Sequence, residues 1–179
     1  NSVLDDIDNY LRSCVKTNRA EFMNPLWGGV SLAGLAGDII ANLSNTSMYT
    51  YELAPLATLI EQTIISRIGE LIGFPQCAGS LTTGGSNGNM LGILCARQAM
   101  IPTSTQSGFD GREMVVFVSE EAHYSVLMAA NVIGIGHRNV IKISCDSDGR
   151  MKPSSLEDEI EFAKKEGRIP FCVVATAGT

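Results

Sequence analysis

The sequence lacks several features that would have pointed directly to a function. No apolar run is long enough to cross a bilayer as a helix, so no transmembrane segment is expected. Lys and Arg number 13 against 19 Asp and Glu, and the net charge of -6 argues against nucleic acid or an anionic membrane as a partner. Neither a Cys-x-x-Cys pair nor a Gly-Lys-Ser/Thr sequence occurs, so neither the usual zinc site nor a P-loop is expected.

The sequence contains five cysteines, and their spacing does not suggest pairs. Their odd number and scattered spacing suit neither a metal site nor a disulfide framework, so free thiols and a cytoplasmic location are expected. They are Cys14, Cys77, Cys95, Cys145 and Cys172. The first residues are acidic and do not show the basic and then apolar pattern of a secretory signal. The chain ends on a strand-like stretch, Phe171 to Thr179, so a portion of a longer protein is expected.

Residues 1–75 have the pattern of a helical segment. Apolar residues recur at helical spacing over residues 3–15, and further helices are predicted over 32–43 and 55–72. The stretch Glu21–Gly29 breaks the helical period with a proline and two glycines. A helical N-terminal segment that contributes to dimerisation is therefore predicted for residues 1–75.

Residues 76–179 alternate between short apolar strands and helices. Strands are predicted over 114–119, 140–144 and 171–176; helices over 90–100, 122–133 and 154–167, the last opened by a Ser154–Glu157 capping box; and an exposed loop over 106–112. This order predicts an α/β domain with a mainly parallel sheet covered by helices on both faces.

Three unusual segments lie next to these predicted strands, at the edge where open α/β sheets bind ligands. They are Thr82–Asn89, Ser119–Tyr124 and Ala175–Thr179. In the first, glycines precede a helix whose free N–H groups and dipole favour a phosphate. A glycine-rich turn with an ordinary helix cap would give the same sequence. The second holds His123, whose ring could stack on an aromatic cofactor, act as an acid or base, or simply pack.

These segments resemble blocks of the group II pyridoxal-phosphate decarboxylases, the family of glutamate, cysteine-sulfinate and aromatic amino-acid decarboxylases. The similarity runs from about Phe22 to Thr179. The matching blocks are Asn45–Pro55, Gly84–Asn89, Ser119–Ser125 and Ala175–Thr179.

The resemblance implies a fold-type-I large domain that works as a homodimer and binds pyridoxal 5'-phosphate. It implies that Gly85, Ser86, Asn87 and Gly88 hold the cofactor phosphate, and that His123 stacks on the pyridine ring and assists catalysis. The family threonine that contacts the cofactor directly follows Thr179, which is the nearest candidate in this chain.

Substrate recognition is assigned by the same resemblance. Asn24 and Leu26 match a substrate-binding Asn-Gln-Leu block of glutamate enzymes, but Pro25 replaces its central glutamine and has no side-chain donor. The block from Asn45 to Pro55 favours a small acidic amino acid such as glutamate, aspartate or cysteine sulfinate.

The resemblance also implies that this chain carries only part of the site. The family lysine that forms a Schiff base with the cofactor, and the aspartate that faces the pyridine nitrogen, belong to motifs that do not occur here. The chain alone is therefore expected to be inactive. The alternatives are another fold-type-I enzyme, such as an aromatic amino-acid decarboxylase or an aminotransferase, or a non-catalytic fragment that serves as an interaction domain.

Overall fold

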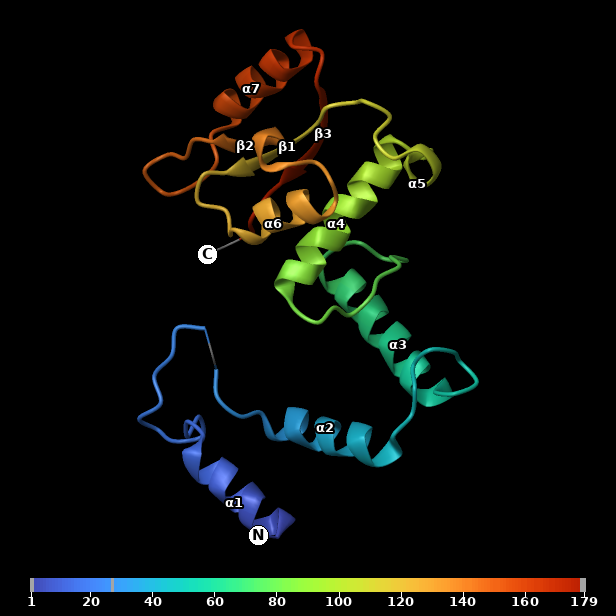
Figure 1. Ribbon diagram of the computed structural model, residues 1–179, viewed down its shortest axis with the longest axis vertical. Coiled ribbons are helices and arrows are strands. Elements are labelled where there is room, and N and C mark those ends of the chain that lie inside the picture. Colours follow the sequence, from blue (N-terminus) through green and yellow to red (C-terminus); the bar gives the residue numbers. More distant parts are fainter. Residues whose placement is uncertain (1, 27, 178–179) are drawn as a thin grey trace. The chain divides into compact units, whose positions relative to one another are not determined.

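The computed structural model describes residues 2–26 and 28–177 (Figure 1). The chain divides into two units, Asn1–Gly79 and Ser80–Thr179, where the sequence analysis placed the division after residue 75. Each unit is described by itself. Within the described ranges, no helix has both the length and the apolar character that crossing a membrane requires.

The described residues of the first unit form three helices, α1 (Val3–Ser13), α2 (Leu32–Ser44) and α3 (Pro55–Leu71). Ser2 and Asp5 form a reciprocal capping box at the start of α1, and Pro55 begins α3 at a position that needs no N–H donor. The three helices match the predicted ranges to within two residues. Neither α1 nor α2 contains a buried residue, so the first unit leaves their apolar faces uncovered.

The second unit is built on a parallel three-stranded sheet with the order β2-β1-β3. The strands are β1 (Met114–Ser119), β2 (Val140–Ile143) and β3 (Ile169–Val174). The helical elements are α4 (Gly85–Met100), α5 (Ser104–Ser107), α6 (Ser125–Val132), the 3-10 helix η1 (His137–Asn139) and α7 (Pro153–Lys165).

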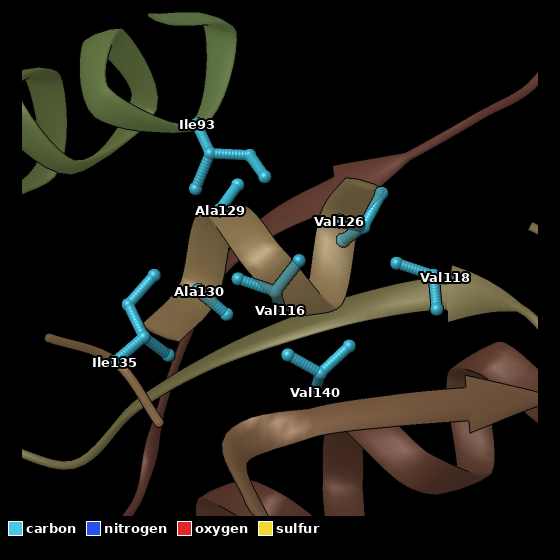
Figure 2. Close-up of a cluster of buried hydrophobic side chains, with 8 residues drawn as sticks. All are labelled: Ile93, Val116, Val118, Val126, Ala129, Ala130, Ile135 and Val140. Carbon is cyan, nitrogen blue, oxygen red and sulfur yellow. The ribbon is translucent and has the colours of Figure 1, made fainter. Parts of the chain in front are cut away.

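The central strand β1 is buried along its whole length because helices cover both faces of the sheet. On one face of the sheet, Val115 and Phe117 form a cluster with Ile143 of β2 and Ala163 of α7. Val116 and Val118 point to the other face, toward α6 and α4. Figure 2 shows this second cluster, which consists of Ile93, Val116, Val118, Val126, Ala129, Ala130, Ile135 and Val140. The predicted α/β class, with a parallel sheet between helices, is confirmed.

Three predicted helix starts are wrong. Helix α4 begins at Gly85 instead of Met90, so the glycine-rich segment forms its first turn, and α6 begins at Ser125 instead of Ala122. The capping box at Ser154 does not form, because Pro153 occupies the first position of α7 and Lys152 is its cap. Within the predicted loop 106–112, the short helix α5 continues to Ser107.

Candidate functional site

The segments at Thr82–Asn89 and Ser119–Tyr124 come together in the second unit. The Asn89 side-chain amide donates a hydrogen bond to the hydroxyl of Ser125, with Nδ2 and Oγ 2.8 Å apart. Ser125 is the first residue of α6 and directly follows the segment that carries His123. This bond joins the N-terminal part of α4 to the first residue of α6, which are far apart in the sequence.

The N-terminus of α4 presents unpaired backbone donors. The amides of Asn87 and Gly88 both donate to the Gly84 carbonyl at 3.1 Å, so they are already used. Within the described part of the chain, the amides of Gly85 and Ser86 have no such acceptor, and no side chain caps the helix. Of the four predicted phosphate-binding residues, Gly85 and Ser86 therefore offer the free N–H groups.

The space beside these donors is open. A Cβ atom built on Gly84 or Gly85 would meet no atom within 4 Å other than those of its chain neighbours and the nearby backbone of α4. Gly88 is more enclosed, because its Cβ would lie 3.4 Å from the Thr82 hydroxyl. Free amides at a helix N-terminus with open space in front fit the phosphate of pyridoxal phosphate.

His123 lies on an exposed turn between β1 and α6, and its ring is held on one side. The backbone N–H of Ser125 donates to Nδ1 of His123 at 3.2 Å. The imidazole and the Tyr124 ring have centroids 4.2 Å apart and planes inclined by 37°. The imidazole is exposed, so it is open to a planar partner.

Glu120 has a role that the sequence analysis did not foresee. Its carboxylate accepts the amide of Cys145 at 2.6 Å, and its own amide donates to the carbonyl of Ile143 at 2.9 Å. Ser119 and Cys145 also contact through Oγ and Sγ at 3.0 Å. These bonds attach the end of β1 to the end of β2. They thereby fix the position of Ser119 and Glu120, where the segment that carries His123 begins.

The third segment lies beside the second. Ala175 and Thr176, which follow β3, line a hollow together with Ser119 and Glu121 from the end of β1. The hollow is also lined by the turn after β2, where hydrogen bonds from the amides of Arg150 and Asp148 lower the pKa of Asp146 and favour its carboxylate form. Thr179, the last predicted cofactor contact, lies outside the described residues.

The two predicted substrate contacts lie in the first unit. The side-chain oxygen of Asn24 accepts the amide of Leu26 at 2.8 Å in a local turn, and both residues are exposed. This oxygen is thus engaged within its own segment.

Potential metal ligands do not gather in the part of the chain that the structure describes. Across residues 2–26 and 28–177, no group of three or more His, Cys, Asp or Glu side chains could hold a metal ion.

Similarity to known proteins extends over the whole chain. The family model described as the pyridoxal-dependent decarboxylase conserved domain matches residues 1–179. Acidic amino acid decarboxylase GADL1 of Xenopus tropicalis is 40% identical over 96% of this chain and 34% of its own length. The mouse protein of the same name is 39% identical over 92% of this chain and 30% of its own length. The chain thus spans about a third of these relatives.

Solved structures with similar folds are also found. The crystal structure of mouse CSAD in apo form superposes with a TM-score of 0.95 at 36% identity, covering 99% of this chain and 38% of that one. Oryza sativa TDC with PLP and tryptamine has a TM-score of 0.86 at 22% identity, over all of this chain and 42% of that one, and shows the fold alone. A match over the whole chain establishes the family: the chain belongs to the pyridoxal-dependent decarboxylases.

Proposed function

We propose that the full-length protein is a pyridoxal-phosphate-dependent decarboxylase of a small acidic amino acid, such as glutamate, aspartate or cysteine sulfinate. The observation that carries this proposal is the joining of two features in one unit. The free amides of Gly85 and Ser86 lie at the start of α4, and hydrogen bonds through Ser125 connect this helix to the exposed ring of His123.

Each feature has a role in this proposal. The amides of Gly85 and Ser86 bind the cofactor phosphate, with the N-terminal end of the α4 dipole adding to the attraction. His123 stacks its ring on the pyridine and acts on a proton through Nε2, since Nδ1 already accepts from Ser125. When bound, pyridoxal phosphate supplies the electron sink that accepts the electron pair released as the carboxylate leaves as CO2.

An acidic substrate is favoured over an aromatic one by the degree of similarity. Relatives named acidic amino acid decarboxylase are 36–40% identical to the chain, whereas the rice structure holding tryptamine is 22% identical. An aromatic decarboxylase and a non-catalytic interaction domain are the alternatives that the experiment below separates.

The remaining parts of the proposed enzyme lie outside this chain. The lysine that binds the cofactor covalently and the aspartate facing the pyridine nitrogen are to be sought in the rest of the full-length protein, so residues 1–179 alone are proposed to be inactive. A homodimer is proposed because the apolar faces of α1 and α2 are uncovered. A cytoplasmic location is proposed from the five free thiols.

Release of CO2 from a panel of amino acids tests the proposal. The full-length protein should decarboxylate at least one of glutamate, aspartate and cysteine sulfinate in preference to tryptophan and tyrosine, and should lose activity when pyridoxal phosphate is removed. The fragment 1–179 serves as the inactive control. A preference for the aromatic substrates would select the first alternative, and no release from any substrate would select the second.

A further inference from the structure

Ser125 makes two hydrogen bonds that connect the two halves of the candidate site. Its hydroxyl accepts from the side-chain amide of Asn89 at 2.8 Å, and its backbone N–H donates to Nδ1 of His123 at 3.2 Å. Ser125 is only 1% exposed, so its hydroxyl has little access to water. Asn89 lies in α4, shortly after the free amides of Gly85 and Ser86.

We propose that Asn89 and Ser125 are positioning residues that fix the His123 ring relative to the N-terminus of α4. This inference rests on the proposed function, because it concerns how two parts of one cofactor site are held at a set separation. Neither side chain needs to touch the cofactor. Their effect passes through the start of α6, from which the turn bearing His123 extends.

The Asn89–Ser125 hydrogen bond lies beside an apolar contact between α4 and α6, and the bond favours one arrangement of the two helices. Val126, Ala129 and Ala130 are buried on α6, and they form one cluster with Ile93 of α4 (Figure 2). Such an apolar contact holds the helices together but is tolerant of small sliding movements. A single directional hydrogen bond between them sets the register that the apolar contact leaves free.

The second hydrogen bond of Ser125, from its backbone N–H to His123, determines which nitrogen of a neutral His123 carries the proton. A neutral imidazole has one donor and one acceptor nitrogen. Because the Ser125 amide donates to Nδ1, the proton lies on Nε2. Nε2–H is then the group that His123 presents on the side away from Ser125.

Variants of the full-length protein test this inference. Asn89→Ala and Ser125→Ala each remove the hydrogen bond between α4 and α6. The double variant lacks the same single bond, so it loses nothing beyond what each single variant loses. Ser125→Thr keeps a hydroxyl acceptor. Ser155→Ala is the matched control, since it deletes another part-buried bond between side chains, from Ser144 to Ser155 at 3.0 Å, which joins the end of β2 to α7 instead of α4 to α6.

We expect each single variant to lower kcat by ~10-fold with KM changed less than ~2-fold, the loss that a small misplacement of a reacting group causes. The circular dichroism induced in the bound cofactor should weaken in both. The double variant should be no worse than the single ones, because both break the same link. Ser125→Thr should recover much of the loss, and Ser155→Ala should behave as the unsubstituted protein.

A readout without cofactor completes the test. The 15N chemical shifts of His123 in cofactor-free full-length protein, assigned by difference from His123→Gln, should be those of the Nε2-protonated tautomer. The Nδ1-protonated tautomer would overturn the assignment of that proton. Losses that add in the double variant, or equal those of Ser155→Ala in both kcat and circular dichroism, would overturn the positioning role.

Failure of this inference is distinct from failure of the proposed function. If the unsubstituted full-length protein neither binds pyridoxal phosphate nor releases CO2, the proposed function is wrong. If it does both while Asn89→Ala and Ser125→Ala match the control, only the positioning inference is wrong. If Ser125→Ala fails to fold, Asn89→Ala decides, because its side chain is exposed.

Discussion

At the residue scale, His123 combines an exposed ring with one fixed nitrogen. Substitution His123→Ala removes the stacking face and the Nε2–H while leaving the buried cores untouched. We expect kcat of the full-length protein to fall by ~100-fold or more, as for loss of a positioned acid or base. Steady-state kinetics measure this, and far-ultraviolet circular dichroism checks that the fold is kept.

The other histidine of this chain is the control for that prediction. His137 is exposed at the start of η1, away from the segments that form the candidate site. His137→Ala should retain kcat within about twofold, as expected for an exposed position without a site contact. Equal losses in the two variants would reduce His123 to a structural residue.

Gly85 permits a direct test of phosphate binding by the main chain. Gly85→Pro deletes the free N–H at the first position of α4, where proline is well tolerated, whereas Gly85→Ala keeps it. A hydrogen bond to a charged group contributes ~1.5–3 kcal/mol, so the Kd for pyridoxal phosphate should be roughly 10- to 100-fold higher in Gly85→Pro than in Gly85→Ala.

Fluorescence titration of cofactor-free protein with pyridoxal phosphate gives both affinities. Gly85→Ala controls for the added Cβ, which meets open space, whereas the ring carbons on the backbone nitrogen are present only in Gly85→Pro. Identical affinities for the two would show that the Gly85 amide does not bind the phosphate.

At the scale of elements, β1 is the strand on which the second unit depends. The side chain of Phe117, in the middle of β1, is fully buried on the face of the sheet that α7 covers. Phe117→Ala should lower the free energy of unfolding by about 3–5 kcal/mol, since it leaves a cavity that the neighbours fill only in part. Phe162→Ala on α7, where the ring is half-exposed, should cost less than about 1 kcal/mol.

Denaturant unfolding of the full-length protein compares the two phenylalanine variants. Similar midpoints for Phe117→Ala and Phe162→Ala would mean that β1 does not form the core of the unit that unfolds.

The elements were more predictable from the sequence than the site. Apolar runs and helical spacing located the three strands and the long helices, because burial imposes those patterns locally. The start of α4 was misplaced because glycine disfavours helix interiors, yet Gly85 lies in the first turn, where that penalty matters less.

The bonds that assemble the site left no such pattern. Asn89 to Ser125 and Glu120 to Cys145 join residues far apart along the chain. Nothing in the local sequence around Ser125 states which helix will lie against it. The candidate residues Gly85, Ser86 and His123 were identified from their unusual segments together with the family resemblance, but their connection required the fold.

At the scale of the whole molecule, the uncovered face of α1 bears on assembly. Ile7 and Leu11 are one turn apart on that face and are about half-exposed. In the proposed homodimer this face is covered, so Ile7→Asp combined with Leu11→Asp should convert dimers to monomers, because burying unpaired carboxylates is costly. Light scattering after size-exclusion chromatography measures the mass.

Asn9→Asp supplies the matched control, since it adds a charge to the polar face of the same helix. It should leave the dimer intact. A dimer that persists in the Ile7→Asp, Leu11→Asp protein would place the interface elsewhere, and a monomeric unsubstituted protein would contradict the homodimer itself.

The use of main-chain donors at the start of α4 has a consequence for how this site can be detected. Every amino acid except proline carries the same backbone N–H, so an alanine scan through residues 85–88 keeps the donors of Gly85 and Ser86. A scan of that kind would report these positions as replaceable. Sequence drift at Ser86 is permitted for the same reason, provided that proline is avoided and the new side chain leaves the space in front open.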